Sequence, residues 1–229
     1  MKPRQLALDL PVRQATGRDA FFVAAPNALA VAEIDRWRDW PSRKLALVGP
    51  EGAGKSHLAA VWAAEAGATV MAAADLPGAG ALPRRAVVED AEAVAGDPAA
   101  ERRLLHLHNG VLEAGGRLLL TGRTAPARWP VALPDLASRL AATPLARIEA
   151  PDDALLSAVL VKLFEDRQLA VTPDLVAYCA RRMERSFAAA QALVAALDAR
   201  ALARGRAPGR RLAAEVLDEM LDAAGGGGP

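Results

Sequence analysis

Short runs of apolar residues alternate with segments of helical periodicity over the first two thirds of the chain. Lys44–Val48 is one such run; Gly49 and Pro50 follow it, and apolar positions then recur at helical spacing over Lys55–Ala66. Four more runs follow, at 69–73, 86–88, 117–121 and 146–148. This alternation is typical of a parallel sheet with helices on its faces. The pattern therefore predicts an α/β fold with a five-stranded parallel sheet flanked by helices.

The pattern changes to helix alone after Pro151, where strand signals disappear. Four amphipathic helices are predicted there, at 152–167, 173–181, 185–204 and 210–222, and one helix at 27–40 is expected before the first strand. We therefore expect four parts: a flexible tail at 1–18, an α/β unit at 19–150, a small all-helical subdomain at 151–222, and a disordered Gly-rich tail at 223–229.

Composition narrows the class of protein. The 229 residues are 52% hydrophobic and 24% charged with a formal net charge of +1, which is ordinary for a globular chain and gives no global reason for tight binding to DNA. No apolar run is long enough for a membrane span, and no signal-peptide core follows Met1. The single cysteine, Cys179, excludes a disulfide framework and is expected to be a buried hydrophobe. We expect a soluble cytoplasmic protein that does not bind membranes.

The residues after the first run carry the clearest chemical signal. Residues 49–56, Gly-Pro-Glu-Gly-Ala-Gly-Lys-Ser, match the P-loop pattern G-x-x-x-x-G-K-[ST] and stand between a predicted strand and a predicted helix. Glycines let backbone N–H groups converge on phosphate oxygens, and the helix adds its positive end. Lys55 would contact the β- and γ-phosphates and Ser56 would ligate Mg²⁺. A Gly-rich surface turn would leave the Lys-Ser pair unexplained. The cofactors expected are ADP or ATP with Mg²⁺, bound by Gly49, Gly52, Ala53, Gly54, Lys55 and Ser56.

Two further strand ends offer candidate catalytic residues. A P-loop enzyme needs an acidic group at a second strand end to orient Mg²⁺ and the attacking water, and Glu89 and Asp90 follow the run 86–88. Glu89 is the candidate metal ligand beside Ser56. A solvated acidic turn is the alternative. Thr121 would hydrogen-bond the γ-phosphate or the water, although a β-branched residue also suits a strand for its own sake.

With these elements in place, the chain resembles the bacterial DnaA/Hda branch of AAA+ proteins over nearly its whole length. Residues 21–27, Phe-Phe-Val-Ala-Ala-Pro-Asn, look like the family's opening motif, which lines the adenine pocket, so the resemblance implies cofactor contacts for Phe22, Val23 and Asn27. Residues 49–57 look like its Walker A segment, which adds His57. The resemblance implies an AAA+ core followed by a helical lid.

The same resemblance implies partners. Residues 133–140, Leu-Pro-Asp-Leu-Ala-Ser-Arg-Leu, are similar to the segment that carries the family's arginine finger, which makes Arg139 the finger. Residues 5–10, Gln-Leu-Ala-Leu-Asp-Leu, look like the short motif by which Hda-type members bind the sliding clamp of DNA polymerase III. No segment after 222 would hold the DNA-reading domain of a DnaA initiator, so we expect the Hda type, with DNA reached only through the clamp. The partner-binding residues implied are Gln5, Leu6, Leu8 and Leu10.

Two departures from the family pattern bear on mechanism. Glu89 stands where the Walker B strand usually ends in Asp, which puts intrinsic ATP hydrolysis in doubt. Ala188 aligns with the sensor 2 arginine, and Arg185, one helical turn earlier, is the substitute we expect, although a solvated arginine is nearly as good an interpretation.

The sequence therefore predicts a regulator of replication initiation that binds adenine nucleotide, docks on the clamp and stimulates ATP hydrolysis by DnaA. The alternative is a small P-loop kinase that phosphorylates a metabolite and whose lid carries catalytic arginines. A third interpretation is a DNA-bound accessory that uses the basic stretch 204–211, although such a run is more often a solvated loop. The oligomeric state stays open, a homo-oligomer included.

Overall fold

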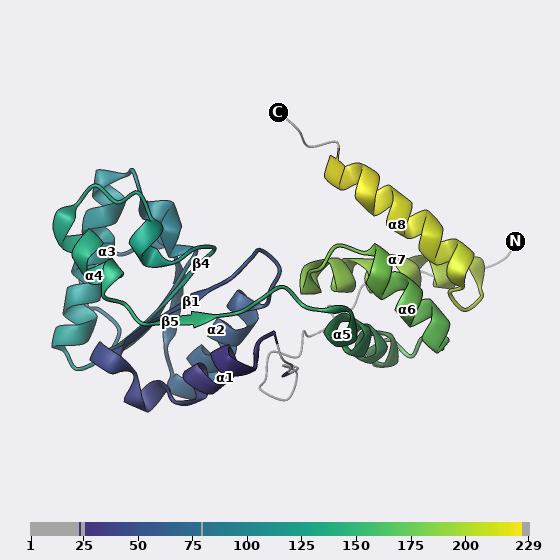
Figure 1. The fold of residues 1–229 in the computed structure, drawn as a ribbon, viewed down its shortest axis with the longest axis horizontal. Coiled ribbons are helices and arrows are strands. Elements are labelled where there is room, and N and C mark those ends of the chain that lie inside the picture. Colours follow the sequence, from purple (N-terminus) through teal and green to yellow (C-terminus); the bar gives the residue numbers. More distant parts are fainter. Residues whose placement is uncertain (1–22, 24–25, 79, 226–229) are drawn as a thin grey trace, which may run out of the picture.

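A five-stranded sheet forms the centre of the first part of the computed structural model, which describes residue 23 and residues 26–78 and 80–225 (Figure 1). All strands are parallel, in the order β2-β3-β4-β1-β5. This confirms the predicted fold class. Each strand begins and ends within one residue of the run that predicted it: β1 Lys44–Val48, β2 Thr69–Ala72, β3 Arg85–Glu89, β4 Arg117–Gly122 and β5 Leu145–Arg147.

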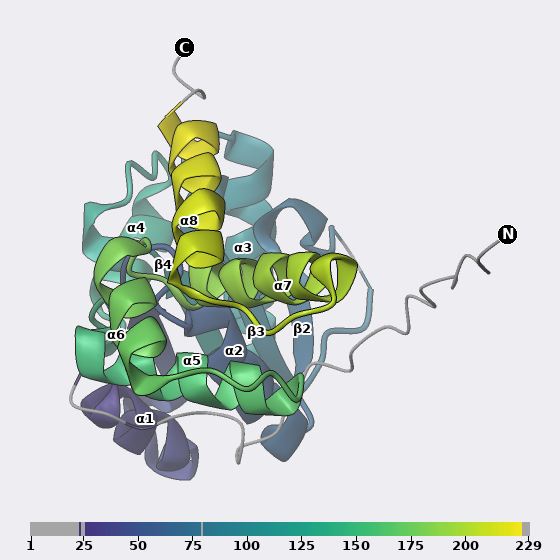
Figure 2. The ribbon, with the colours of Figure 1, turned by 90° about the vertical axis from the view of Figure 1, so that its right-hand side faces the viewer.

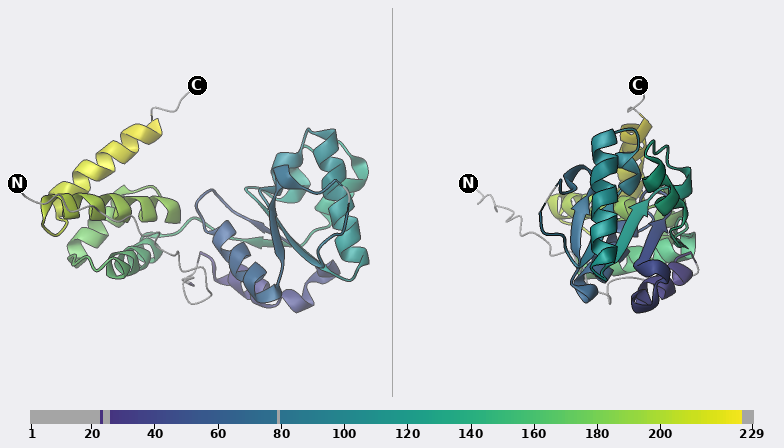
Figure 3. Two further views of the ribbon diagram at one scale, coloured as in Figure 1. Left: turned by 180° about the vertical axis from the view of Figure 1, so that it is seen from behind. Right: turned by 90° about the vertical axis from the view of Figure 1, so that its left-hand side faces the viewer.

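Helices cover both faces of the sheet (Figure 3). α1 (Ala28–Asp35) and α2 (Lys55–Ala66) pack on one face, and α3 (Pro98–Glu113) and α4 (Pro134–Ala141) pack on the other. Short 3₁₀ turns lie between these elements: η2 Trp37–Asp39, η3 Pro41–Arg43, η4 Ala73–Asp75, η5 Ala91–Val94 and η6 Pro126–Arg128.

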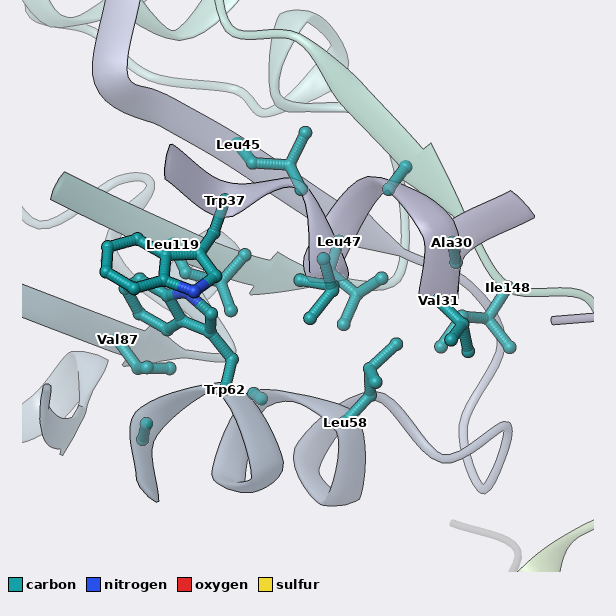
Figure 4. Close-up of a cluster of buried hydrophobic side chains, with 14 of the residues drawn as sticks. Ala30, Val31, Trp37, Leu45, Leu47, Leu58, Trp62, Val87, Leu119 and Ile148 are labelled. Atoms are coloured by element: carbon teal, nitrogen blue, oxygen red, sulfur yellow. The ribbon is translucent and has the colours of Figure 1, made fainter. Parts of the chain in front are cut away.

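The core follows from the alternation of side chains along buried strands. In β1, Leu45 and Leu47 join the cluster under α1 and α2, whereas Ala46 and Val48 join the cluster under α3 and α4. Figure 4 shows the first cluster, where Trp62 of α2 lies among strand side chains. Both clusters consist of buried apolar side chains, so the strand ends that carry loops are held in fixed positions.

The first helix is shorter than its periodicity predicts. α1 ends at Asp35 rather than near Trp40, and the chain then turns through η2 and η3. Trp40 lies 5.0 Å from Trp62 between ring centroids, and Trp37 meets Trp62 edge to face. The three rings can pack together only if the helix stops, because a continued helix would carry Trp40 away. Tertiary packing therefore overrides the local helical pattern.

Arginines at the amino edge of the sheet satisfy carbonyl groups at the ends of the covering helices. Arg85 donates to the carbonyl of Ala66, the last residue of α2, at 2.6 Å. Arg43 donates to the carbonyl of Leu112 near the end of α3 at 2.8 Å. Helix carboxyl ends carry unpaired carbonyls and partial negative charge, so these cations stabilise the covering layers at the edge opposite the P-loop.

Four helices form a second part beside the sheet (Figures 1 and 2). They are α5 (Asp153–Asp166), α6 (Pro173–Arg182), α7 (Phe187–Arg204) and α8 (Arg210–Gly225). Polar side chains cap three of them: Asp152, Thr172 and Ser186 accept backbone N–H bonds at the starts of α5, α6 and α7. α8 runs to Gly225, three residues beyond its predicted end at 222.

The helical part has its own apolar core, which includes Phe164 and Cys179. Cys179 is fully buried, as expected, and burial raises the pKa of its thiol to about 11. In the stretches that the structure describes, no helix combines the length and apolar character that crossing a bilayer demands.

Candidate functional site

Three adjacent strands deliver the candidate residues to one edge of the sheet. β3, β4 and β1 are neighbours, so the segments that follow them, beginning with Asp90, Arg123 and the P-loop, emerge side by side at the carboxyl edge. They border a cavity of about 470 Å³, a volume suited to a small-molecule ligand. The P-loop and α2 contribute Glu51, Gly52, Gly54, Lys55, Ser56, His57 and Ala60 to its lining.

The P-loop has the backbone form that phosphate binding requires. Gly54 lies in the left-handed region, with φ 96°, immediately before α2 begins at Lys55. Glycine adopts this conformation without strain, and it turns the chain so that the first N–H groups of α2 face the loop. Gly49 and Ala53, also predicted to bind cofactor, belong to the loop but are not among the residues that border the cavity.

Lys55 is folded back onto its own loop. Its Nζ donates to the carbonyl oxygens of Gly49 at 2.9 Å and Pro50 at 2.8 Å, and only 8% of the residue is exposed. Burial lowers the pKa of Lys55, although the carboxylates of Asp90, Glu92 and Glu51 act in the opposite direction. A phosphate would therefore supply the anionic partner that this buried ammonium lacks.

Of the two acidic candidates, Asp90 borders the cavity and Glu89 does not. Glu89 is the last residue of β3 and pairs in register with Ala72 of β2. Asp90 has φ 48°, a strained conformation for a residue with a side chain, and its N–H donates to Thr121 Oγ1 at 3.0 Å. Thr121 is 1% exposed and lies off the cavity lining, so in this structure it holds the backbone of Asp90.

The cavity can hold magnesium only together with a phosphate. Ser56 contributes a hydroxyl to its lining, and Asp90 and Glu51 contribute carboxylates, of which Glu51 pairs with Arg123. Mg²⁺ bound with nucleotides takes one or two such protein ligands together with phosphate oxygens and water. Among the described residues, no group of three or more His, Cys, Asp or Glu side chains is arranged to hold a metal ion. The residues present therefore fit a nucleotide-bound Mg²⁺ with Asp90 in the place predicted for Glu89.

The helical part closes the cavity from the other side. Phe187, Ala188 and Gln191, from the first two turns of α7, complete that wall. The N–H of Phe187 donates to the carbonyl of Gly52 at 3.0 Å, and a Cβ added to Gly52 would come within 2.1 Å of Cβ of Ser186. The start of α7 thus lies directly against the P-loop, and only glycine leaves room for it.

Arg185 lies close to this wall without joining it. Its guanidinium pairs with Asp153 at 2.8 Å, with a longer contact to the carbonyl of Pro151 at 3.5 Å. Ala188 does border the cavity, but as an alanine it brings no charge. The lid side of the cavity is therefore uncharged over its described lining, and Arg185 is not part of that lining.

Arg123 borders the cavity and was not singled out from the sequence. Its guanidinium pairs with Glu51 of the P-loop at 3.1 Å and with Glu92 at 3.8 Å. The turn that presents it is held by Glu92, whose carboxylate lies 3.4 Å from the N–H of Thr124. The sequence shows that Arg123 comes one residue after a predicted strand. It does not show which strands lie beside that strand in the sheet, so Arg123 could not be assigned to the site.

The predicted finger, Arg139, lies on α4 away from the cavity. Its Nε lies 3.1 Å from Asp135 Oδ1 one turn earlier, and its side chain is 39% exposed. Its backbone carbonyl accepts a hydrogen bond from Lys44 Nζ at 2.8 Å and another from Thr143 Oγ1 at 2.9 Å. The structure thus fixes the backbone of Arg139 and leaves part of its side chain accessible.

The remaining predicted residues lie at or beyond the limits of the described chain. Val23 is 52% exposed and Asn27 is 1% exposed just before α1, and neither borders the cavity. Phe22 lies outside the described residues, as do the clamp-motif residues Gln5, Leu6, Leu8 and Leu10.

The fold of this chain is similar to folds among the solved structures. No family model matches the chain. Among solved structures, domain III of the replication initiation protein DnaA from Thermotoga maritima matches with a TM-score of 0.77 at 16% identity, over 92% of this chain and 98% of that domain. The fold is that of DnaA domain III. At such an identity the likeness establishes the fold of the chain and leaves its activity to be argued from its own residues.

Two further DnaA structures were solved with nucleotide. DnaA from Aquifex aeolicus bound to AMPPCP matches with a TM-score of 0.65 at 16% identity, over 76% of this chain. A replication initiator DnaA bound to AMPPCP and single-stranded DNA matches with a TM-score of 0.66 at 15% identity, over 77% of this chain. The chain spans 62% of the length of each of these two proteins.

Proposed function

We propose that the chain binds ADP or ATP with Mg²⁺ in the cavity between the P-loop and α7. The single observation that carries this is the convergence of Lys55, Ser56 and Asp90 with the first turns of α7 around one cavity of about 470 Å³. The AMPPCP bound to DnaA proteins of the same fold supports an adenine nucleotide.

The residues of the chain have separate tasks in this proposal. The backbone N–H groups of the P-loop and of the start of α2 bind phosphate oxygens, and Lys55 exchanges the carbonyls of Gly49 and Pro50 for the β- and γ-phosphates. Ser56 and Asp90 would hold Mg²⁺, which neutralises charge between the phosphates when bound. Thr121 keeps Asp90 in place through the N–H bond. Because Glu89 lies off the cavity lining, hydrolysis by the chain alone is expected to be weak.

We further propose that the chain regulates replication initiation by stimulating ATP hydrolysis on DnaA. Arg139 is the residue that would reach the γ-phosphate held by DnaA, because it does not border the chain's own cavity and Lys44 of β1 holds its backbone carbonyl. Residues 5–10 would dock on the sliding clamp of DNA polymerase III, with Leu8 and Leu10 in an apolar pocket and Gln5 in polar contact. This places the chemistry between two proteins.

The metabolite kinase receives no support from the cavity. A kinase lid is expected to bring several arginines to the phosphates, whereas the lid residues that border this cavity are Phe187, Ala188 and Gln191. The basic stretch expected of a DNA-bound accessory is partly neutralised as well, because Arg204 and Arg211 both pair with Glu215. The regulator is thus the better account of these residues.

Calorimetric titration of the full-length chain with ADP and with ATP, each with Mg²⁺, tests the first proposal. We expect saturable heat for the wild-type chain and its loss in Lys55→Ala. Folded wild-type protein that gives no heat with either nucleotide would overturn the proposed site.

The second proposal is tested by measuring phosphate release from ATP-loaded DnaA in the presence of clamp on DNA. Adding the chain should raise the rate, and Arg139→Ala should remove most of the stimulation, since an arginine finger supplied in trans contributes about 10³-fold or more. Arg139→Ala should still bind the clamp in a pull-down, while Leu8→Ala should not. Full stimulation by Arg139→Ala would refute the assignment of the finger.

A further inference from the structure

The charges around the cavity are unevenly distributed between its walls. Lys55 and Arg123 are the lysine and arginine that border it, and Glu51 and Asp90 are the acids. The wall made by α7 carries no charged side chain among its described residues. A bound nucleotide brings several negative charges to one end of this cavity, so cations that can turn toward that end decide its affinity.

Arg123 and Lys55 border the same cavity, and Arg123 pairs with Glu51 of the P-loop that carries Lys55. Burial lowers the pKa of Lys55, and the positive charge of Arg123 acts in the same direction. Arg123 directly follows β4, next to β3, the strand that delivers Asp90. The N–H groups at the start of α2 engage the inner phosphates of a P-loop nucleotide, so the terminal phosphate points toward these strand ends.

The present partners of Arg123 are ones that a phosphate can replace. Its side chain is 64% exposed, and the side chain of Glu51, with which it pairs at 3.1 Å, is 79% exposed. An ion pair this exposed contributes little to stability. By contrast, a guanidinium can bind phosphate oxygens through two parallel N–H bonds, which is the stronger arrangement. The exchange of Glu51 for a phosphate therefore costs little.

We propose that Arg123 binds the γ-phosphate of ATP within the same chain and so supplies the positive charge that Ala188 on the lid does not. Glu51 and Glu92 pair with its guanidinium beside the cavity, and on ATP binding the γ-phosphate would replace Glu51 as its partner. The chain then distinguishes ATP from ADP through a residue of the α/β part and not through the lid. This inference rests on the proposed nucleotide site.

Titration of the full-length chain with ADP and with the non-hydrolysable analogue AMPPCP, each with Mg²⁺, tests it. Arg123→Ala is expected to weaken AMPPCP about tenfold and ADP by no more than about twofold, because one charge-assisted contact to the terminal phosphate is lost. Arg123→Lys should recover part of the loss. Arg128→Ala is the matched control: this arginine lies on η6, is exposed and does not border the cavity, and both affinities should stay at the wild-type values.

A second measurement covers the case in which Arg123→Ala unfolds. Glu51→Gln should tighten AMPPCP by freeing Arg123, and that gain should shrink in the double variant with Arg123→Gln. The proposal would be overturned if Arg123→Ala weakened the affinities for ADP and AMPPCP equally, or weakened neither. Equal weakening would show that Arg123 only supports the P-loop through Glu51. Absence of binding in the wild-type chain would instead overturn the proposed function.

Discussion

Lys44, the first residue of β1, donates its Nζ to the backbone carbonyl of Arg139 at 2.8 Å. The same ammonium lies 3.3 Å from Nε2 of His108 on α3, and burial lowers its pKa, with the charge of Arg139 acting in the same direction. The strand that leads into the P-loop and the helix that carries the predicted finger are therefore joined by one buried donor. The backbone of Arg139 is fixed even though its side chain is partly free.

Lys44→Met should loosen the end of α4. The substitution leaves the His108 acceptor unpaired and removes one of the two donors to Arg139, so we expect a loss of about 1–3 kcal/mol in the free energy of unfolding. Hydrogen exchange should become faster at the backbone N–H groups of residues 139–143. Lys162→Met, which removes an exposed pair with Asp166, is the control and should cost much less. Unchanged exchange in α4 would contradict the role given to Lys44.

Gly52→Ala should separate the lid from the P-loop. Gly52 has φ 70°, and its added Cβ would come within 2.1 Å of Ser186 Cβ. Gly67→Ala is a matched control, because Gly67 has φ 64° but no atom within 4 Å of its added Cβ. Both variants carry the backbone strain of about 1–2 kcal/mol, and only Gly52→Ala carries the clash. Nucleotide titration should show binding retained in Gly67→Ala and lost in Gly52→Ala; equal affinities would refute a close lid.

Glu101 should be essential to the loop that enters α4. The side chain is 1% exposed and accepts backbone N–H bonds from Gly96, Ala132 and Leu133. Glu101→Ala would leave these donors buried without a partner, and we expect urea unfolding at neutral pH to show a loss of about 2–4 kcal/mol. Glu113→Ala, at an exposed position of the same helix, is the control and should stay within about 0.5 kcal/mol of wild type.

The pH dependence of Glu101 follows from the same bonds. The N–H of Ala132, first among its partners, lowers the pKa of the carboxyl in the folded chain. Its stabilising contribution is therefore complete above the unfolded pKa, near 4.5, and is lost as the pH falls through the lowered folded value. In Glu101→Gln, the free energy of unfolding should therefore depend less steeply on pH below 4.5 than it does in the wild-type chain.

His108 gives a different pH window. Burial lowers its pKa to about 4 from 6.5 in the unfolded chain. Between these values the unfolded chain binds the proton and the folded chain does not, so stability falls as the pH drops from 6.5 to about 4. His108→Gln keeps an acceptor for Lys44 but does not titrate. The unfolding temperature of this variant should therefore change less between pH 4.5 and 6.5 than that of the wild-type chain. A residual slope is expected from His57, whose pKa burial also lowers.

Local sequence pattern was sufficient for the sheet and for the P-loop. The three inner strands β1, β3 and β4 are short apolar runs that are mostly buried, and the edge strands β2 and β5 are short runs that are largely exposed. The loop is defined by glycines and a Lys-Ser pair that are adjacent in the chain. The early end of α1 could not be predicted in this way, because it depends on the position of the Trp62 ring, which belongs to α2 and packs against Trp40. Patterns of this kind give elements but not the contacts between them.

The site was predictable in part for the same reason. Lys55 and Ser56 belong to one motif, and Asp90 directly follows a strand, so local reasoning reached them. Arg123 depends on β4 lying between β3 and β1, which no local pattern gives. Phe187 and Gln191 depend on how the lid is placed on the P-loop. Glu101 and His108 were missed because polar residues on an amphipathic helix are normally exposed. Both are buried here, Glu101 against the loop that precedes α4 and His108 beside Lys44 of β1.

The bond from the N–H of Phe187 to the carbonyl of Gly52 joins the P-loop to the end of an 18-residue helix. A helix of that length is a rigid arm about 27 Å long, so a tilt of about 10° at its anchored end displaces the far end by about 5 Å. Any tilt of α7 about its bond to the P-loop would therefore move Arg204, and α8 beyond it, further than it moves Phe187.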